Sequence, residues 1–325
     1  MNYFKLQIYV LVLLMALGSC SGAYITANDH NSIGSGTNNG KTIYVANNGT
    51  DRNNGLTPET PKRNIANAIR SANPNDTIKV SPGTYRENIV IDKNITIIGN
   101  NQNNTILDGN QADICIIIQP ELKVHITNLT IKNGKDPGNG YYGGGIQNYG
   151  NLTITNTTIT NNTSDYGGGI RSYGPITLKK ATITNNHVGA AGGGISIRNT
   201  LVVEDSTITN NTAWWGGGID TDIKPVILRR VNIKNNSAGA DGGGISSVSE
   251  SLTIEDSTIT GNSAEKNGGG IYMVRLMYIY GSEITNNRAN DGGGIYIRGD
   301  AYIDDLTKIA NNTLNNLGGR PFIPA

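Results

Sequence analysis

Two acidic residues, Asp220 and Asp222, are the first candidates for chemistry. They alternate along one short run, so in a β-strand they would share a face with Cα atoms about 7 Å apart. Carboxylates at such a separation can serve as acid and base on a glycosidic bond. With Arg198 one repeat earlier, they could instead hold Ca²⁺ beside a uronic acid, with the arginine as base. The alternative is an ion pair between neighbouring strands, without catalysis.

A second group of residues suits binding rather than catalysis. Trp214 and Trp215 come directly before a run of three glycines, and exposed flat rings suit sugar faces and protein contacts. Arg171, Tyr173 and Tyr272 stand one or three residues after other "GGGI" segments, at positions predicted to face outward. We expect these five residues to bind a ligand. The alternative is that the tryptophans cover a corner of the fold.

The sequence predicts no resident cofactor or metal site, although Ca²⁺ stays open. Three histidines are scattered along the chain and form no metal or triad constellation. Asp165, Asp241 and Asp291 lie in the segments just before glycine triplets, where they could bind Ca²⁺. They do not follow the nonapeptide calcium repeat, however.

These residues belong to a repeat, and the repeat predicts the fold. Glycine triplets followed by isoleucine recur every 24 to 26 residues, beginning at Gly143, Gly167, Gly192, Gly216, Gly242, Gly268 and Gly292. Within each unit the apolar residues alternate in short runs, as in "NLTITNTTIT" over 151–160, which is typical of β-strands. Strands of one unit can pair only with the same strand of the next. We therefore expect an all-β, right-handed parallel β-helix solenoid with three short strands per coil of about 25 residues.

One asparagine column accompanies the repeat. It lies three residues after an aligned isoleucine in every unit, at Asn162, Asn186, Asn211, Asn236, Asn262, Asn287 and Asn312. A side-chain amide can donate to one coil and accept from the other, so a structural ladder is expected.

The rest of the chain divides around these repeats. Residues 1–23 read as a signal peptide and residues 24–40 as a flexible spacer. Residues 41–135 are expected to form irregular first coils and a small helical cap, with Ile65, Ala68 and Ile69 on one helix face. The regular repeats span 136–312, and 313–325 is a C-terminal tail.

The signal segment ends in "LGSC", which resembles a bacterial lipobox with Cys20 as the lipidated residue. Ordinary cleavage after Ala23 is the alternative; either way we expect a secreted or cell-surface protein. Membrane contact would come only through the lipid anchor. Cys115 is expected to be a buried free thiol. With 26 basic and 25 acidic residues, the chain has no charge excess that would favour nucleic acid as a partner.

"GGGI" paired with "IxxN" over about 130–312 resembles the repeats of polymorphic outer-membrane proteins, which are adhesins. It is still more similar to adhesin-like β-helix proteins of methanogenic archaea. The N-terminal third resembles pectin-lyase-like β-helix proteins. This chain departs from the repeat by using Ile where Phe is common and Gly where Ala is common.

Three functions fit these observations, and the fold alone does not separate them. The resemblance implies an adhesin-like surface protein that binds a polysaccharide, a cell-surface glycoconjugate or surface proteins. The main alternative is a polysaccharide lyase or glycoside hydrolase that uses Asp220, Asp222 and Arg198. The third is a passive surface spacer.

Overall fold

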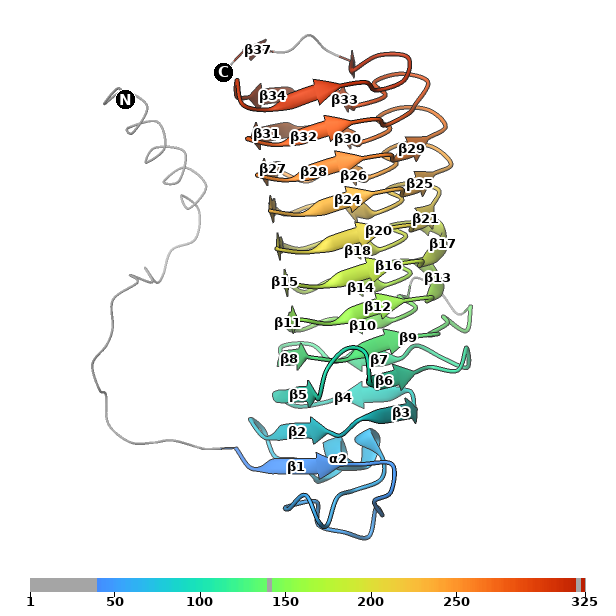
Figure 1. The fold of residues 1–325 in the computed structure, drawn as a ribbon, viewed down its shortest axis with the longest axis vertical. Coiled ribbons are helices and arrows are strands. Elements are labelled where there is room, and N and C mark those ends of the chain that lie inside the picture. Colours follow the sequence, from blue (N-terminus) through green and yellow to red (C-terminus); the bar gives the residue numbers. More distant parts are fainter. Residues whose placement is uncertain (1–39, 139–141, 320–322, 325) are drawn as a thin grey trace, which may run out of the picture. The chain divides into compact units, whose positions relative to one another are not determined.

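The computed structural model describes residues 40–138, 142–319 and 323–324, and these form a parallel β-helix (Figure 1). In Figure 1 the coils stack one on the next, from the blue N-terminal coils to the red C-terminal ones. Every strand pairing between the named strands is parallel and joins one coil to the next. Among the described residues, no helix is long and apolar enough to span a membrane.

Three long sheets form the walls. Sheet A consists of β1 (Thr42–Val45), β2 (Thr77–Val80), β5 (Ile95–Gly99), β8 (Lys123–Thr127), β11 (Asn151–Thr155), β15 (Ile176–Lys179), β19 (Leu201–Glu204), β23 (Val226–Arg229), β27 (Ser251–Glu255), β31 (Leu276–Tyr280), β34 (Asp300–Ile303) and β37 (Ile323–Pro324). Sheet B consists of β3 (Gly83–Arg86), β6 (Thr105–Asp108), β9 (Thr130–Lys132), β12 (Thr158–Thr160), β16 (Thr182–Thr184), β20 (Thr207–Thr209), β24 (Asn232–Lys234), β28 (Thr258–Thr260), β32 (Glu283–Thr285) and β35 (Lys308–Ala310). Sheet C consists of β4 (Ile89–Ile91), β7 (Ile116–Ile118), β10 (Ile146–Asn148), β14 (Ile170–Ser172), β18 (Ile195–Ile197), β22 (Ile219–Thr221), β26 (Ile245–Ser247), β30 (Ile271–Met273), β33 (Ile295–Ile297) and β36 (Leu317–Gly319).

A fourth, smaller sheet was not predicted. Sheet D consists of β13 (Thr163–Tyr166), β17 (His187–Ala191), β21 (Thr212–Ala213), β25 (Ser237–Ala238) and β29 (Ser263–Ala264). It lies in the segment between the asparagine column and the glycine triplets. The expected β-helix is therefore confirmed, with an additional sheet on one corner.

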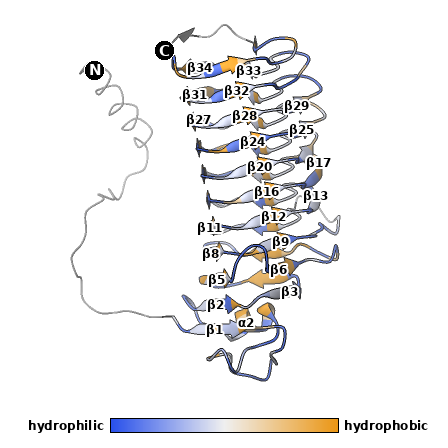
Figure 2. Ribbon diagram, in the orientation of Figure 1, coloured by the Kyte–Doolittle hydropathy of each residue, from blue (hydrophilic) through white to orange (hydrophobic). Residues whose placement is uncertain are grey.

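The interior is a stack of aliphatic side chains held in register. Ile146 pairs with Ile170, Ile170 with Ile195, and the column continues to Ile295, with each isoleucine fully buried. In Figure 2, α2 (Ile65–Ser71) and β6 show orange, apolar segments, whereas β13 and β17 are mostly blue or pale. As expected, α2 buries Ile65, Ala68 and Ile69, and it packs on β1, β2 and β4 at the N-terminal end of the solenoid.

The asparagine column forms a continuous hydrogen-bonded ladder, which is buried from Asn162 to Asn287. Asn186 shows the pattern: its Oδ1 accepts from the backbone N–H and from Nδ2 of Asn162, at 3.0 and 2.9 Å. Its own Nδ2 donates to Asn211 Oδ1 and to the carbonyl of Ile159. A buried amide whose donors and acceptor are all paired stabilises the coil stack instead of weakening it.

The corners use two separate devices. The residue before each ladder asparagine has a positive φ, for example +55° at Asn161, which asparagine tolerates better than most residues. The triplets must be glycine for a steric reason as well. A Cβ on Gly169 would lie 2.5 Å from the carbonyl oxygen of Gly194 in the next coil.

Three further predictions can be compared with the structure. The expected tail, 313–325, instead contributes β36 and β37 to sheets C and A. The expected buried free thiol is confirmed: Cys115 is fully buried, and burial raises the pKa of its thiol to about 12. The proposed signal peptide, the lipidation site at Cys20 and the spacer as far as residue 39 lie outside the described residues.

Candidate functional site

The acidic candidate lies on the outer side of sheet C, in a polar row that crosses four coils. Register places Arg171 of β14, Ser196 of β18, Asp220 of β22 and Ser246 of β26 side by side. Arg171 Nη1 donates to Ser196 Oγ, and Ser196 Oγ donates to Asp220 Oδ2 at 3.5 Å. The row thus joins a cation and a carboxyl through a hydroxyl.

The Asp220 carboxyl is only partly accessible, and this changes its acidity. Burial raises the pKa of Asp220 to about 7, and the neighbouring Asp222 carboxylate adds to the increase. Arg171 and the hydroxyls of Ser196 and Ser246 act in the opposite direction. A carboxyl that titrates near neutral pH can take up or release a proton under working conditions.

Asp222 has a different environment. Its Oδ2 lies 3.2 Å from Arg198 Nε, and both side chains are more than two-fifths exposed. The predicted neighbour relationship of Arg198 and Asp222 is therefore confirmed. An exposed pair of this kind contributes about 0–1 kcal/mol to stability. The carboxyl of Asp220, in β22, and that of Asp222, just after β22, thus differ in exposure and in partner.

In most repeats, the first residue after "GGGI" is buried and does not reach solvent as expected. Arg171 is 2% exposed and Tyr272 is 8% exposed, so the prediction that these side chains face solvent is wrong. The glycine triplets pack against this column: a Cβ on Gly216 would lie 2.9 Å from Asp220 Cβ. Because glycine lets the backbone approach closely, the preceding loop covers the column.

Arg171 is instead held between aromatic rings. Its Cζ lies 4.8 Å from the ring centroid of Tyr166 and 5.1 Å from that of Tyr173. Its Nε is buried without a hydrogen-bond partner among the described residues. A guanidinium between two rings gains cation–π attraction, so Arg171 supports Tyr173 from behind.

Tyr173 lies at the surface of this cluster. Its ring stacks on that of Tyr149, with centroids 5.4 Å apart and planes within 7°. Arg198 Cζ lies 5.8 Å from the Tyr173 ring on the other side. Sheet C therefore brings Tyr149, Tyr173, Arg198 and Asp222 together on its outer rim. Tyr272 lies further along the same sheet, stacked on Tyr296 at 5.6 Å.

The tryptophan pair forms a separate feature on the sheet D corner. Trp214 and Trp215 are each 43% exposed, and their rings are perpendicular with centroids 6.2 Å apart. Both backbone N–H groups donate to the carbonyl of Ala190 at 2.9 Å, which fixes the pair to the preceding coil. In the following coil, Trp214 rests on Gly239, where a Cβ would lie 2.7 Å from Cε3.

Two of the aspartates considered for Ca²⁺ already have partners. Asp241 Oδ1 accepts from the backbone and side-chain nitrogens of Asn267, at 3.1 and 2.8 Å. Asp291 Oδ1 accepts from Asn315 Nδ2 at 2.8 Å. In the part of the chain that the structure describes, no three His, Cys, Asp or Glu residues gather in a way that could hold a metal ion.

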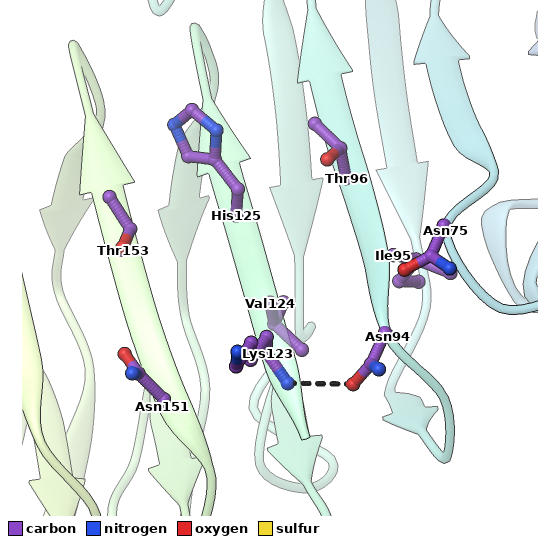
Figure 3. Close-up of a pocket in the computed structure, with 9 residues that line it drawn as sticks. All are labelled: Asn75, Asn94, Ile95, Thr96, Lys123, Val124, His125, Asn151 and Thr153. Carbon is purple, nitrogen blue, oxygen red and sulfur yellow. Dashed lines mark hydrogen bonds between the residues drawn. The ribbon is translucent and has the colours of Figure 1, made fainter. Parts of the chain in front are cut away.

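The sequence did not predict a shallow depression of about 330 Å³ on the outer face of sheet A (Figure 3). Figure 3 shows Thr96, His125 and Thr153 side by side on neighbouring strands, with Asn94, Lys123 and Asn151 in a second row. Burial lowers the pKa of His125, and its Nε2 lies 3.3 Å from Thr155 Oγ1. A second depression, of about 360 Å³, lies beside α2. Neither depression contains a predicted site residue.

With this geometry described, comparison with known proteins gives the family. A family model described as a right-handed β-helix region matches residues 89–254, just over half of the chain. The chain belongs to the right-handed β-helix family. In this β-helix protein, the Chlamydia polymorphic membrane protein repeat also matches residues 256–273 and 281–298. Both matches confirm the expected resemblance, while the closer likeness to archaeal proteins stays a prediction.

Among solved structures, a pectate lyase has a similar fold. A pectate lyase, Pel9A, is 14% identical, with a TM-score of 0.51 over 87% of this chain and 79% of its own. The pectin methylesterase from Aspergillus niger is 13% identical (TM-score 0.48, 87% of this chain and 90% of its own). The lacto-N-biosidase from Eubacterium ramulus is 10% identical (TM-score 0.47, 87% and 68%). No curated protein matches the sequence. At these identities the likeness extends to the fold alone.

Proposed function

We propose that this β-helix protein is an exported cell-surface protein that binds glycans of polysaccharides or neighbouring cells, an adhesin-like function. The repeats that match the polymorphic membrane protein model support a surface location. A solenoid suits this role because each added coil extends a stiff surface on which binding residues can stand. Lipidation at Cys20 would attach the protein to the membrane that it is exported across.

The exposed tryptophan pair carries this proposal. Two large rings at right angles can contact a sugar on its flat apolar face and along one edge. The surroundings leave the rings uncovered: Ala190 and Ala191 stand in the coil before them, and Gly239 and Ala240 in the coil after. Lys266 Nζ, 6.0 Å from the Trp214 ring, adds a cation at the rim.

The outer rim of sheet C offers a second contact area. Tyr173, stacked on Tyr149, and the partly exposed pair of Arg198 and Asp222 combine aromatic surface with hydrogen-bond donors and acceptors. Sugar binding uses both kinds of group. We assign Tyr173 to ligand contact, and Arg171 to holding Tyr173 in place.

A glycan array tests the proposal. The purified protein is applied to neutral and acidic polysaccharides with Ca²⁺ present, beside the W214A/W215A double variant and L306A as a control. Leu306 is 82% exposed in a late coil, so its loss tests the effect of removing any exposed apolar side chain. If the double variant loses glycan binding and L306A keeps it, the result supports the adhesin-like function. Binding by neither the protein nor its control would favour the passive spacer.

A polysaccharide lyase or glycoside hydrolase is the second candidate, because of the contrast between the two carboxyls. Asp220, with a pKa raised to about 7, suits the acid, and Asp222 beside Arg198 suits the base. Residues two apart on one strand face have Cα atoms about 7 Å apart. Side chains starting at that separation can place their carboxyl groups at the spacing of an inverting hydrolase, about 6.5–9.5 Å. In a lyase, Arg198 would take the role of base and Ca²⁺ would bridge the carboxylates to a uronic acid. New chain ends that disappear in D220N would establish the enzyme.

A further inference from the structure

A second column of asparagines runs beside the buried ladder, and it faces solvent. These residues precede the ladder asparagines at the corner between sheets B and D: Asn161, Asn185, Asn210, Asn235, Asn286 and Asn311. All six are exposed, and all have φ between +54° and +57°. The column therefore repeats one local geometry from coil to coil.

The two columns differ in what their amides do. The Nδ2 of the ladder residue Asn211 makes hydrogen bonds to Asn236 Oδ1 and to the carbonyl of Ile183. By contrast, the side-chain amide of the neighbouring Asn210 has no hydrogen-bond partner in the described part of the chain. The same holds for Asn161, Asn235 and Asn311. Their amide nitrogens are available to a reagent or an enzyme.

Four of the six exposed asparagines also carry an acceptor sequence for N-glycosylation, Asn-x-Ser/Thr. The hydroxyl residues two positions later are Thr163, Thr212, Ser237 and Thr313. Thr163, Ser237 and Thr313 are exposed, and Thr212 is half-buried. The other two, Asn185 and Asn286, have His187 and Arg288 at that position and so lack the motif.

We propose that Asn161, Asn210, Asn235 and Asn311 are acceptor sites for N-linked glycans, arranged in a row along this corner. The inference rests on the export proposed above, because the modification takes place on exported chains. In the reaction, the asparagine Nδ2 forms a bond to the anomeric carbon of a lipid-linked saccharide phosphate. The bond from that carbon to the phosphate oxygen breaks, the phosphate leaves with the electron pair, and the amide loses one proton.

The buried ladder gives an internal contrast. Asn162 also stands in an Asn-x-Ser motif, with Thr163 and Ser164 after it, but its side chain is fully buried. Its Nδ2 already donates to Asn186 Oδ1 at 2.9 Å. A glycan there would break the ladder, so Asn162 is excluded while Asn161, one residue away, is an acceptor.

The coil spacing limits how many sites are filled at once. Asn210 and Asn235 lie in adjacent coils, and neighbouring strands are about 4.8 Å apart. Two bulky saccharides cannot stand side by side at that separation. Asn161 lies two coils from Asn210, and Asn311 three coils from Asn235. We therefore expect at most three glycans in the row of any one molecule, with Asn210 and Asn235 excluding each other.

The test is intact-mass and glycopeptide mass spectrometry of the full protein isolated from its own cells. We expect glycans at Asn161 and Asn311, partial and mutually exclusive occupancy at Asn210 and Asn235, and none at Asn162. N235Q should raise occupancy at Asn210 toward completeness. R288T places a motif on Asn286, in the same exposed geometry. It should create a new glycopeptide there and lower the occupancy of Asn311, which lies in the adjacent coil.

Several results would overturn the inference. These are an unmodified row, simultaneous glycans at Asn210 and Asn235, or glycans confined to exposed motifs elsewhere, such as Asn151. Surface labelling of intact cells separates this inference from the function on which it rests. A labelled but unglycosylated protein would remove the glycan row and leave export intact, whereas an unlabelled, unglycosylated protein would contradict export itself.

Discussion

Nδ2 of Asn211 donates to Oδ1 of Asn236 at 3.0 Å, and both side chains are buried. The backbone N–H of Asn211 donates to the same oxygen, also at 3.0 Å. One carbonyl oxygen in each coil therefore satisfies two donors from the coil before it. Because this bond repeats from coil to coil, the ladder holds successive coils together along the corner between sheets B and D.

Replacing Asn211 with alanine should destabilise the protein more than its small loss of volume implies. The backbone N–H and Nδ2 of Asn186 would both lose their acceptor. Each buried polar group left unpaired costs about 1–3 kcal/mol, so we expect the free energy of unfolding to fall by about 2–4 kcal/mol. Urea denaturation of N211A measures this. The control is N185G, at an exposed position where glycine accepts the positive φ; an equal loss in both variants would contradict a structural ladder.

The solenoid was predictable from sequence because its signals repeat with the coil. An isoleucine equivalent to Ile170 and an asparagine equivalent to Asn186 recur in every unit. Stacking in register places each of these positions in the same environment in successive coils. Register also predicts pairs in neighbouring coils correctly, as for Arg198 and Asp222. Sheet D was not predicted because segments such as "TSDY" and "HVGAA" lack alternating apolar residues. Their strands form through backbone hydrogen bonds between coils.

Which residues of the site are exposed to solvent was harder to predict than which residues lie close together in it. Alternation indicates that Arg171 points away from the interior, but not that a glycine loop packs over it. Exposure on the outside of a solenoid depends on how the corners fold back, which one strand's pattern does not encode. The depression around His125 likewise depends on the shape of less regular coils.

The glycine triplets should tolerate no side chain at their third position. In G169A, the new Cβ would lie 2.5 Å from the Gly194 carbonyl oxygen, and backbone cannot rotate away as a side chain can. We expect a loss of about 3 kcal/mol or more, or failure to fold. Circular dichroism and urea denaturation measure this, with G189A as the control, because nothing lies closer than 3.9 Å to its Cβ position. A G169A protein as stable as G189A would show that the triplets have another purpose.

Asp220 should make the folded protein less stable as pH rises from about 4 to about 7. Burial raises its pKa to about 7 in the folded state, whereas an unfolded aspartate titrates near 3.9. Between these values the folded state binds more protons than the unfolded state, so raising the pH favours unfolding. D220N, which stays neutral, should match the parent near pH 4 and exceed it in stability at pH 8.

D222N provides the comparison, since Asp222 is exposed and paired with Arg198. Thermal melts of the three proteins across pH 4–8 should separate D220N from the parent only toward the upper end. A D220N melt that follows the parent at every pH would mean that the carboxyl is solvated like an ordinary surface aspartate.

Gly239 should control glycan binding without itself touching a ligand. In G239A, the new methyl group would lie 2.7 Å from Cε3 of Trp214, so the ring must move off its present position. Because Trp214 is 43% exposed, the ring can turn into solvent and the fold should change little in stability. We expect altered tryptophan fluorescence and weaker retention on the glycan that the parent binds. The matched control is G189A, on the other side of the pair, where the nearest atom to the added methyl is Asp165 Oδ1 at 3.9 Å. G239A and G189A could bind the glycan equally well while only G239A changes its fluorescence. That outcome would mean that the position of Trp214 does not determine binding. The glycan would then contact another surface, and the cluster of Tyr173 and Arg198 is the next candidate.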